Sequence, residues 1–599
     1  MKLKSLVIEN FRNFLRVEVN LTNQNVIFGM NDMGKTNLMC ALRYLLDRDM
    51  RKNGFKESDF YKSLTEKVIR ITLGVDLSDR VENNDSKHII AKVGGARSSD
   101  ELNSFFFRVE GTYDKGEEAG IPKLFWGNKV DELEEIVQEG SFSPIDKIFN
   151  IVYVDPTIDL STTFSKNRKK LFDQKKLDEQ DIGISREIKD LGIQLNAKIS
   201  SMNVIQSFQT LITEEYKKLK KEKINIEMKS ELSINGYFSN LIPYIKKDND
   251  DNIYPTSGDG RKKILAYSLL NHLIKAQEGN RIIIFLIEEP ENSLHRSMQI
   301  ALSKQLFSSE VYQYFFLSTH SSELLYEMDN ASLIRIYSKE TVVCESYIYQ
   351  VDDEYKQVKK ELNRSLATAL FAEKVLLVEG PSEKVLFEKI LEEVSPMYEL
   401  DGGYILDVSG IKFKPYSKVL KKLNIDVIVK TDNDLKAKRG QPKVFDLIGL
   451  QRCMNLLNIE LEDNDIPSLE SVEIDYFHKG RKTFSENTKI KKIIEMKLKI
   501  YDRYFDEINR MKDKQIYLSK IDLEHDLFEV IGNRMTEILG KNPVKYLQDH
   551  KLINMIELTN SLLEEDCIKI IQHPLFESLR KLVKHEQSSG SGGERSDTQ

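Results

Sequence analysis

Apolar and polar residues alternate with a period of two in several stretches near the start of the chain, a pattern typical of strands with one buried face. The alternation covers Leu6–Val19, which reads as two strands joined by a short turn, and it returns at Ile69–Leu77 and Phe105–Glu110. Ile148–Val154 is almost entirely apolar and is closed by Asp155 and Pro156. We therefore expect the first part of the chain to be rich in strands.

Helical spacing replaces this alternation in the middle of the chain. Ser185–Lys229 is largely polar, with apolar residues at helical intervals, which predicts long helices. We interpret residues from about 157 to 250 as a helical insertion in the first domain. Its apolar stripe is either a dimerisation surface or an ordinary intradomain core.

Strands and helices alternate after this insertion. A helix is expected at Arg261–Lys275, after the break at Pro255–Gly260. The strands expected next are Arg281–Ile287, Val311–Ser318 and Ala331–Tyr337. Such alternation predicts a mostly parallel α/β sheet.

A second α/β pattern follows the charged stretch Ser338–Leu370, where we see helix-like segments and place the domain junction. The strands expected beyond it are Lys374–Glu379, Tyr404–Val408, Asp426–Lys430 and Ile516–Leu518, with helices at Ser382–Val394, Pro415–Leu423 and through most of Leu527–Leu582. The lysine-rich stretch Lys436–Lys514 is predicted to be helical with loops. This organisation predicts domains at residues 1–348 and 349–587, and a disordered tail at residues 588–599.

Composition narrows the class of protein. A chain of 599 residues with 40% hydrophobic and 31% charged residues is expected to be soluble and to hold more than one domain. The net charge of −7 means that DNA would be bound by local patches rather than by a general positive field. The four cysteines have no zinc or redox spacing, which favours a reduced cytoplasmic setting. We also expect no membrane span and no signal peptide.

A phosphate-binding loop is the first motif that carries chemistry. Gly29 begins a G-x-x-x-x-G-K-T run that ends at Gly34, Lys35 and Thr36, between the apolar Val26–Phe28 and a helical pattern at Asn37–Leu46. In this setting, backbone N–H groups bind phosphate oxygens, the lysine reaches the terminal phosphates and the threonine hydroxyl binds Mg²⁺. The further nucleotide contacts predicted from the loop are Asn31, Asp32 and Asn37.

The other parts of a nucleotide site follow two later strands. Glu288 and Glu289 end the apolar run Ile282–Ile287, and His320 ends the next strand. Glu288 is expected to hold Mg²⁺ through its waters, and Glu289 to polarise the attacking water. A histidine at the place of His320 can contact the γ-phosphate of ATP.

A second group of carboxylates lies in the second α/β pattern. Glu379 follows a buried strand, and Glu383 comes in the first turn of the next helix. Asp432 and Asp434 follow another strand and lie on one side of the chain. Four carboxylates at neighbouring strand ends repel one another unless divalent cations lie among them, and Mg²⁺ or Mn²⁺ suits oxygen ligands. An acidic surface edge is the alternative interpretation.

The first set of motifs resembles the ATP-binding-cassette (ABC) head. Lys35 with Thr36, Glu288 with Glu289, and His320 match that family, as does the turn formed by Ser257, Gly258, Asp259 and Gly260. The resemblance implies that Ser257, Gly258 and Gly260 contact ATP bound to a partner protomer. The sequence departs from the family at Glu288, where an Asp is usual, and at the bulky Met33, and no glutamine loop is evident.

The second set resembles a Toprim domain: Glu379-Gly380 with Glu383, then a strand that ends in Asp432 and Asp434. An ABC-type head with a helical insertion, followed by a Toprim α/β domain with a helical C-terminal elaboration, is the architecture of the overcoming-lysogenization-defect (OLD) nucleases, including those of the Gabija anti-phage system. The resemblance implies that Asp522, Glu524 and Lys551 complete the site. It also implies double-stranded DNA as substrate, a homo-oligomer (a tetramer built as a dimer of dimers) and a helicase-like partner, GajB.

Two further functions remain open from the residues. An ATP-dependent DNA clamp or repair factor would carry the same head with a structural acidic cluster, and a topoisomerase-like Toprim enzyme would need a nucleophilic tyrosine. Lys436, Lys438, Arg439 and Lys443 follow the acidic pair and are expected either to hold a DNA backbone or to be ordinary solvated side chains.

Overall fold

The structure is a computed structural model. It describes residues 1–30, 32–93, 103–136, 142–157, 179–219, 244–246, 253–255, 258–275, 281–338, 340–409, 413–461, 469–475 and 486–583. The chain divides into two compact units. The first comprises Met1–Tyr153, Arg281–Glu288 and Gln299–Gln599, and the second comprises Val154–Asn280 and Glu289–Met298. Each unit is described by itself.

An antiparallel sheet begins the first unit, with the strand order β2-β1-β4-β5-β6-β7. Its strands are β1 (Lys2–Phe11), β2 (Phe14–Asn20), β4 (Ile69–Asp76), β5 (Ser104–Asp114), β6 (Ala119–Gly127) and β7 (Glu134–Glu135). The hairpin and the two later strands predicted here from alternating residues are confirmed. The alternation is visible in the burial pattern of β5, whose apolar residues point to one side.

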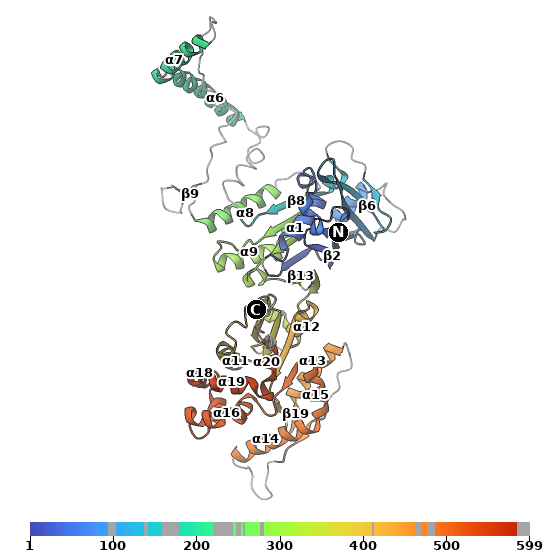
Figure 1. Ribbon diagram of the computed structural model, residues 1–599, viewed down its shortest axis with the longest axis vertical. Helices are drawn as coiled ribbons and strands as arrows, with labels where there is room; N and C mark the ends of the chain where they lie inside the picture. Colours follow the sequence, from blue (N-terminus) through green and yellow to red (C-terminus); the bar gives the residue numbers. More distant parts are fainter. Residues whose placement is uncertain are drawn as a thin grey trace, which may run out of the picture. The chain divides into compact units, whose positions relative to one another are not determined.

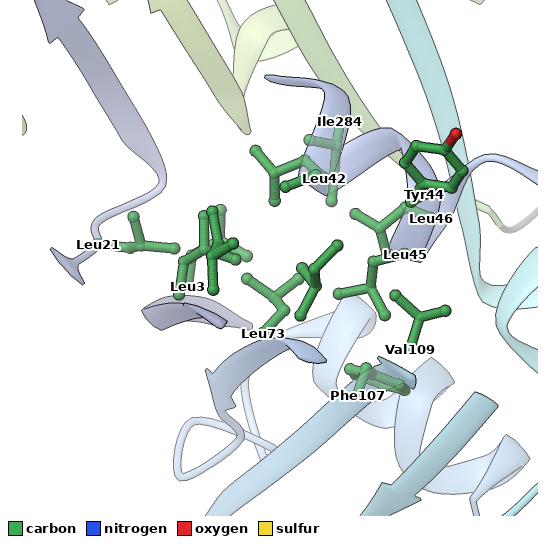
Figure 2. Close-up of a cluster of buried hydrophobic side chains, with 14 of the residues drawn as sticks. Leu3, Leu21, Leu42, Tyr44, Leu45, Leu46, Leu73, Phe107, Val109 and Ile284 are labelled. Atoms are coloured by element: carbon green, nitrogen blue, oxygen red, sulfur yellow. The ribbon is translucent and has the colours of Figure 1, made fainter. Parts of the chain in front are cut away.

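A second, mostly parallel sheet carries the phosphate loop, with the order β14-β13-β3-β12-β11-β8. Its strands are β3 (Gln24–Phe28), β8 (Phe149–Val154), β11 (Ile282–Glu288), β12 (Phe315–Ser318), β13 (Ala331–Ser338) and β14 (Val342–Tyr349). Helix α1 (Lys35–Leu46) follows β3. Figure 2 shows how Leu42, Leu45 and Leu46 of α1 face apolar residues of both sheets, among them Leu73, Phe107 and Ile284. This core fixes the start of α1, and therefore the loop before it.

The third sheet of the first unit is parallel throughout, with the order β16-β15-β17-β21. Its strands are β15 (Lys374–Val378), β16 (Gly403–Asp407), β17 (Asp426–Thr431) and β21 (Ile516–Leu518). Val26, Phe28 and Leu333 of the second sheet share one buried core with Val375 and Leu377 of β15. The two parallel sheets are therefore packed into one continuous core.

Helices and one small sheet surround the third sheet. The helices are α10 (Lys359–Ala369), α11 (Pro381–Val394), α12 (Phe413–Lys422), α13 (Ile448–Leu461), α14 (Glu486–Arg503), α15 (Phe505–Asp513), α16 (Leu523–Leu539), α17 (Pro543–Asp549), α18 (Lys551–Ser561), α19 (Glu564–Gln572) and α20 (Glu577–Leu582). Figure 1 shows α11, α16, α18 and α19 gathered on one side of the sheet. Their apolar faces form a separate core with Leu376, Val378 and Ile428. The small sheet consists of β18 (Leu435–Lys438), β19 (Gln441–Leu447) and β20 (Val472–Glu473).

The second unit contains the helices predicted for the insertion and the helix predicted after it. They are α6 (Glu179–Ser200), α7 (Asn203–Leu219) and α8 (Asp259–Lys275), with a short hairpin of β9 (Tyr244–Lys246) and β10 (Ile253–Pro255). Leu191, Ile193 and Leu211 of α6 and α7 are exposed. The use of this stripe as a dimerisation surface stays a prediction. Among the described helices, none combines the length and apolar character that a membrane crossing requires.

Three predicted stretches are correct only in part. Residues 311–314 are not part of β12, because a 3-10 turn at Glu310–Tyr312 comes first. The stretch Ser338–Leu370 holds strand β14, which pairs antiparallel with β13 along its whole length. The stretch Lys436–Lys514 contains the predicted helices, α13, α14 and α15, but it begins with the β18–β19 hairpin, which was not predicted. For β14 and the β18–β19 hairpin, the pairing partner, and not the local residue pattern, decides the structure.

The α/β fold class is confirmed, and so are the order of the elements and the parallel arrangement of the last sheet. The domain limits at residues 348 and 587 stay a prediction, and the predicted tail at residues 588–599 lies outside the described residues.

Candidate functional site

The phosphate loop has the geometry that its glycines require. Gly29 and Gly34 have φ angles of 154° and 112°, which L side chains rarely adopt. A β carbon on Gly29 would lie 2.3 Å from the carbonyl oxygen of Ile336, and one on Gly34 would lie 2.4 Å from the Asn13 amide. The buried Lys35 donates from Nζ to the carbonyl oxygens of Gly29 and Met30, at 2.9 and 3.1 Å. The loop is therefore folded around its lysine.

Thr36 and Glu288 meet across the sheet, although 252 positions separate them. The Thr36 hydroxyl donates to Oε2 of Glu288 at 3.0 Å, and Tyr153 donates its hydroxyl to Oε1 at 3.2 Å. The glutamate is buried at the end of β11, and β12 separates β11 from β3. The longer side chain that replaces the usual Asp still reaches Thr36, so these two residues fit a shared Mg²⁺ ion.

The predicted contacts Asp32 and Asn37 lie on either side of the loop's lysine. Asp32 has a positive φ of 63°. The side chain of Asn37 accepts from Arg12 Nη1 and donates to Asn13 Oδ1, both at 2.9 Å. The turn between β1 and β2 therefore supports the phosphate loop. Arg12 and Asn13 were not predicted from the sequence, because only the pairing of the sheets brings them to the loop.

His320 follows β12, between the strands that lead to the loop and to Glu288. Its imidazole is stacked on the ring of Phe371, with the centroids 5.6 Å apart. Phe371 also contacts Phe28 of β3 edge-on, at 6.2 Å. The histidine is thus in contact with the segment that enters β15.

The remaining predicted nucleotide contacts lie in the second unit. The Asn292 amide donates to the Glu289 carboxylate at 3.2 Å, and the buried Lys263 donates to the carbonyl oxygens of Asn292 and Pro156, both at 3.1 Å. Burial lowers the pKa of Lys263, against the raising effect of nearby carboxylates.

The glycines of the Ser257–Gly260 turn are placed at the start of α8. A β carbon on Gly260 would lie 2.6 Å from the carbonyl oxygen of Ser293, whereas Gly258 has open space. Of the predicted contacts, Asn31 and Ser257 lie outside the described residues. The roles of Glu289, Gly258 and Gly260 toward a partner's ATP stay predictions.

Three neighbouring parallel strands deliver the second set of carboxylates to one edge of the third sheet. Glu379 follows β15, Asp432 and Asp434 follow β17, and Asp522 and Glu524 follow β21. Glu383 comes from the first turn of α11. Because parallel strands end at the same edge, all six predicted carboxylates belong to one cluster. In addition to its burial, the negative charges of Glu379, Asp522, Glu524 and Glu383 accordingly raise the pKa of Asp432.

Burial and mutual repulsion raise the pKa of several of these carboxylates. Asp432 is buried, which raises its pKa, and the charge of Glu379 raises it further. Burial, with the charge of Glu379, raises the pKa of Glu383 to about 6. Burial and the charge of Asp522 raise the pKa of Glu524. Burial acts against ionisation of Asp522 too, but its hydrogen bond to His525 and the charge of His525 outweigh it and lower the pKa.

Basic side chains from several helices lie against the cluster. Arg452 of α13 forms an ion pair with Glu379 and lies 3.7 Å from Oδ2 of Asp434. Lys497 of α14 lies 3.9 Å from Oδ1 of Asp434. The predicted Lys551 lies 3.9 Å from Oε1 of Glu524, and His525 Nδ1 lies 2.6 Å from Oδ1 of Asp522.

Two of these basic residues, Arg452 and Lys497, were not predicted from the sequence. No spacing relates them to the acidic motifs, because α13 and α14 reach the cluster only through the tertiary fold.

The cluster fits a divalent cation. All six carboxylates offer the oxygen ligands that Mg²⁺ and Mn²⁺ prefer. Oε2 of Glu524 is buried and has no hydrogen-bond partner among the described residues. Within the same residues, no three side chains of Asp, Glu, His or Cys lie close enough together to form a metal-ligand set. The cation that lies between Glu379 and Asp434 in this structure is the guanidinium of Arg452.

Sequence comparison with known proteins shows which family the chain belongs to. The chain is 50% identical over 586 residues to "Endonuclease GajA" of Bacillus cereus strain VD045, which covers 97% of this chain and 99% of the relative. This protein belongs to the GajA family. A second GajA, from strain HuB5-5, is 21% identical over 79% of this chain and 83% of its own length, and the "Old nuclease" of Escherichia phage P2 is 22% identical over 77% and 82%.

Two family models match successive parts of the chain. The model "Protein of unknown function (DUF2813)" matches residues 1–362, and "Overcoming lysogenization defect protein-like, TOPRIM domain" matches residues 370–434. The predicted membership of the OLD nucleases is confirmed, and so is the Toprim domain, which contains Glu379, Glu383, Asp432 and Asp434. Asp522, Glu524 and Lys551 lie beyond the matched residues, and their roles stay predictions.

Among solved structures, an Smc head domain with an extended coiled coil, bound to the C-terminal domain of ScpA derived from Pyrococcus furiosus, matches over 60% of this chain and 100% of its own chain at 15% identity, with a TM-score of 0.33. A TM-score at this level supports no conclusion about the function of this chain.

Proposed function

We propose that this protein is a divalent-metal-dependent DNA endonuclease, controlled by ATP in its ABC-type head and acting in anti-phage defence. The observation that carries the proposal is the meeting of Glu379, Asp432 and Asp522 at one edge, formed by β15, β17 and β21. The name endonuclease belongs to the relatives, and it agrees with this chemistry.

The cluster supplies what phosphodiester hydrolysis requires. Glu379, Glu383, Asp432, Asp434, Asp522 and Glu524 would hold Mg²⁺ or Mn²⁺. Such an ion activates water and stabilises the leaving oxygen. Lys551, beside Glu524 and within the field of Asp432 and Glu383, would offset the charge that develops on the phosphate. The Glu379 carboxylate accepts from the backbone N–H of Asp432 at 2.9 Å, which ties the first acidic strand end to the second.

The head is proposed to bind ATP with Mg²⁺ through Lys35, Thr36 and Glu288. Its influence on the nuclease site would pass through Arg335 of β13. The buried Arg335 guanidinium donates to the carbonyl oxygens of Ala372 and Leu423 at 3.1 Å and to that of Asn424 at 2.6 Å. Ala372 precedes β15 and Asn424 precedes β17, so one side chain of the head holds the entry of both acidic strands.

The partners are proposed from the family: double-stranded DNA as substrate, a tetramer built as a dimer of dimers, and the helicase-like GajB.

In the described residues, the basic patch after Asp434 is partly neutralised, because Lys438 lies 3.5 Å from Asp446 and Lys443 lies 3.1 Å from Asp475. Lys436 and Arg439 are the exposed members of that patch that form no ion pair with another described residue, and they are the better candidates for a DNA contact.

Cleavage of supercoiled plasmid tests the proposal. Wild type is expected to nick or linearise the plasmid with Mg²⁺ or Mn²⁺, and Glu379→Ala is expected to be inactive. Glu373→Ala is the matched control, because Glu373 precedes the same strand at its other end. The absence of cutting by wild type at any ATP concentration would favour a DNA clamp, and a covalent tyrosine–DNA adduct would favour a topoisomerase.

A further inference from the structure

A cavity of about 460 Å³ opens beside the nuclease cluster, between α14 and the α16–α17 helices. Its end wall contains Asp522, which His525 contacts through Nδ1 and to which Gln548 donates from Nε2 at 3.0 Å. The predicted metal ligand is therefore shared between the cluster and this cavity. A group bound in the cavity would lie next to the reacting phosphate.

The floor of the cavity is apolar, although it opens to solvent. Its apolar lining comprises Ile490, Ile493, Ile494, Ile521, Phe528, Pro543 and Val544. Phe528 and Ile490 are 44% and 43% exposed. An exposed apolar floor of this kind indicates a surface that is covered when the protein works.

The ring of Phe528 lies close to Gly532, one turn further along α16. A β carbon on Gly532 would lie 3.2 Å from the ring, so the ring lies against the helix at this point. Glycine costs helix stability in such a position, yet it lets an aromatic ring lie close to the backbone. The ring thereby offers an apolar surface to the cavity.

The rim of the cavity is basic. Lys491, Lys541 and Lys545 line it, and none of them forms an ion pair with another described residue. By contrast, the neighbouring Lys492, which does not line the cavity, lies 3.3 Å from Glu495. Lys497 lies deeper and links the cavity to Asp434.

We propose that this cavity binds one unstacked nucleotide of the DNA strand that is being cut, with its base on Phe528 and its flanking phosphates against Lys541, Lys545 and Lys491. An apolar floor with an aromatic ring suits a base, which stacks on aromatic side chains whatever its sequence. Unpaired lysines suit phosphates, and a peptide would find no carboxylate on the described rim except Asp522. The inference rests on the proposed nuclease function and names the way in which its site holds the substrate.

The affinities of two single-stranded oligonucleotides, measured without added metal, distinguish the contribution of the base from that of the phosphates. One is a fluorescent oligothymidylate, and the other is an abasic strand of equal length. Wild type is expected to bind the oligothymidylate about five- to tenfold more tightly than the abasic strand, since one stacked base contributes at least this factor. Phe528→Ala is expected to remove the difference, whereas Phe505→Ala, an exposed phenylalanine of α15, is expected to keep it.

The lysines are tested on the same two strands. The double variant Lys541→Ala/Lys545→Ala is expected to weaken both strands by a similar factor and to lower the slope of log K against log salt by about 1.4. Lys492→Ala/Lys499→Ala removes the same charge from α14 outside the cavity, and is expected to weaken binding less.

Equal binding of the two strands by wild type, or a ratio unaffected by Phe528→Ala, would overturn the inference. Because Phe528 is 44% exposed and lies outside the buried cores, its variant is expected to fold, and an unchanged melting temperature checks this. If plasmid is cut normally but the two strands bind equally, the cavity inference fails and the nuclease function stands. If plasmid is never cut but the ratio depends on Phe528, the cavity binds a base of single-stranded DNA and the nuclease function fails.

Discussion

His320 and Phe371 are stacked, with their ring centroids 5.6 Å apart and their planes at 26°. The histidine follows the strand beside the phosphate loop, and the phenylalanine comes three residues before β15, which Glu379 directly follows. One ring contact thus joins the predicted γ-phosphate contact to the strand that carries a nuclease carboxylate.

We expect Phe371→Leu to uncouple the two sites. Leucine keeps apolar volume but loses the stacked ring, so a change at His320 would no longer reach the entry of β15. In cleavage assays across an ATP titration, the ratio of activity with ATP to activity without it should become about one, whichever way ATP acts on wild type, as we also expect for Lys35→Ala.

Phe371→Tyr is the control for this prediction. It keeps the ring and should keep the response to ATP. A normal response in Phe371→Leu would show that the stack carries no signal.

Arg452 is expected to compete with the metal ion. Its guanidinium pairs with Glu379 and lies 3.7 Å from Asp434, two predicted metal ligands. Removing this internal cation in Arg452→Gln should strengthen Mn²⁺ binding by about tenfold, which corresponds to about 1.4 kcal/mol. Titration calorimetry measures the change directly.

Arg503→Gln makes the same charge change at an exposed position of α14 and should leave Mn²⁺ affinity unaltered. Weaker Mn²⁺ binding by Arg452→Gln would mean instead that Arg452 supports the occupied site.

Asp432→Asn should stabilise the metal-free protein. Asp432 is buried among like charges, and their repulsion is a cost of the empty cluster. Without metal, we expect the melting temperature of the variant to be about 2–4 °C above that of wild type, which corresponds to a gain of about 1 kcal/mol in the free energy of unfolding. We also expect the variant to lose the stabilisation that Mn²⁺ confers on wild type. A melting temperature that falls without metal, or an undiminished response to Mn²⁺, would contradict this expectation. Thermal melts with and without Mn²⁺ provide both readings.

The buried ion pair between Lys430 and Asp526 should be essential for the fold of the Toprim domain. Their charged atoms lie 2.8 Å apart, and both side chains are almost completely buried. Asp526→Ala would leave Lys430 charged and unpaired next to the strand end at Asp432, at a cost of about 3–5 kcal/mol. Urea unfolding measures the loss.

Replacing both partners, in Lys430→Met/Asp526→Leu, should restore much of that stability, because no buried charge is then left without a partner. Equal losses in the single and the double variant would show that packing, and not charge, dominates at this place.

Much of the fold was predictable because its signals are local. The β1–β2 hairpin, the strand–loop–helix of the phosphate loop and the strand–helix alternation of the Toprim domain follow from residue periodicity within a few turns of the chain. β14 and the β18–β19 hairpin were missed, because their burial depends on a partner strand rather than on a clean alternation.

The sequence by itself determined which carboxylates could act together in pairs. Glu379 with Glu383, and Asp432 with Asp434, each lie within five residues at a strand end, so local geometry suffices. Only the tertiary structure decided that Asp522 and Glu524 join them, because β21 pairs with β17 across more than eighty residues of chain. The same holds for Arg452 and Lys497, and for the basic, apolar cavity beside Asp522. Their positions depend on packing between distant helices, and packing of that kind leaves no periodic mark in the sequence.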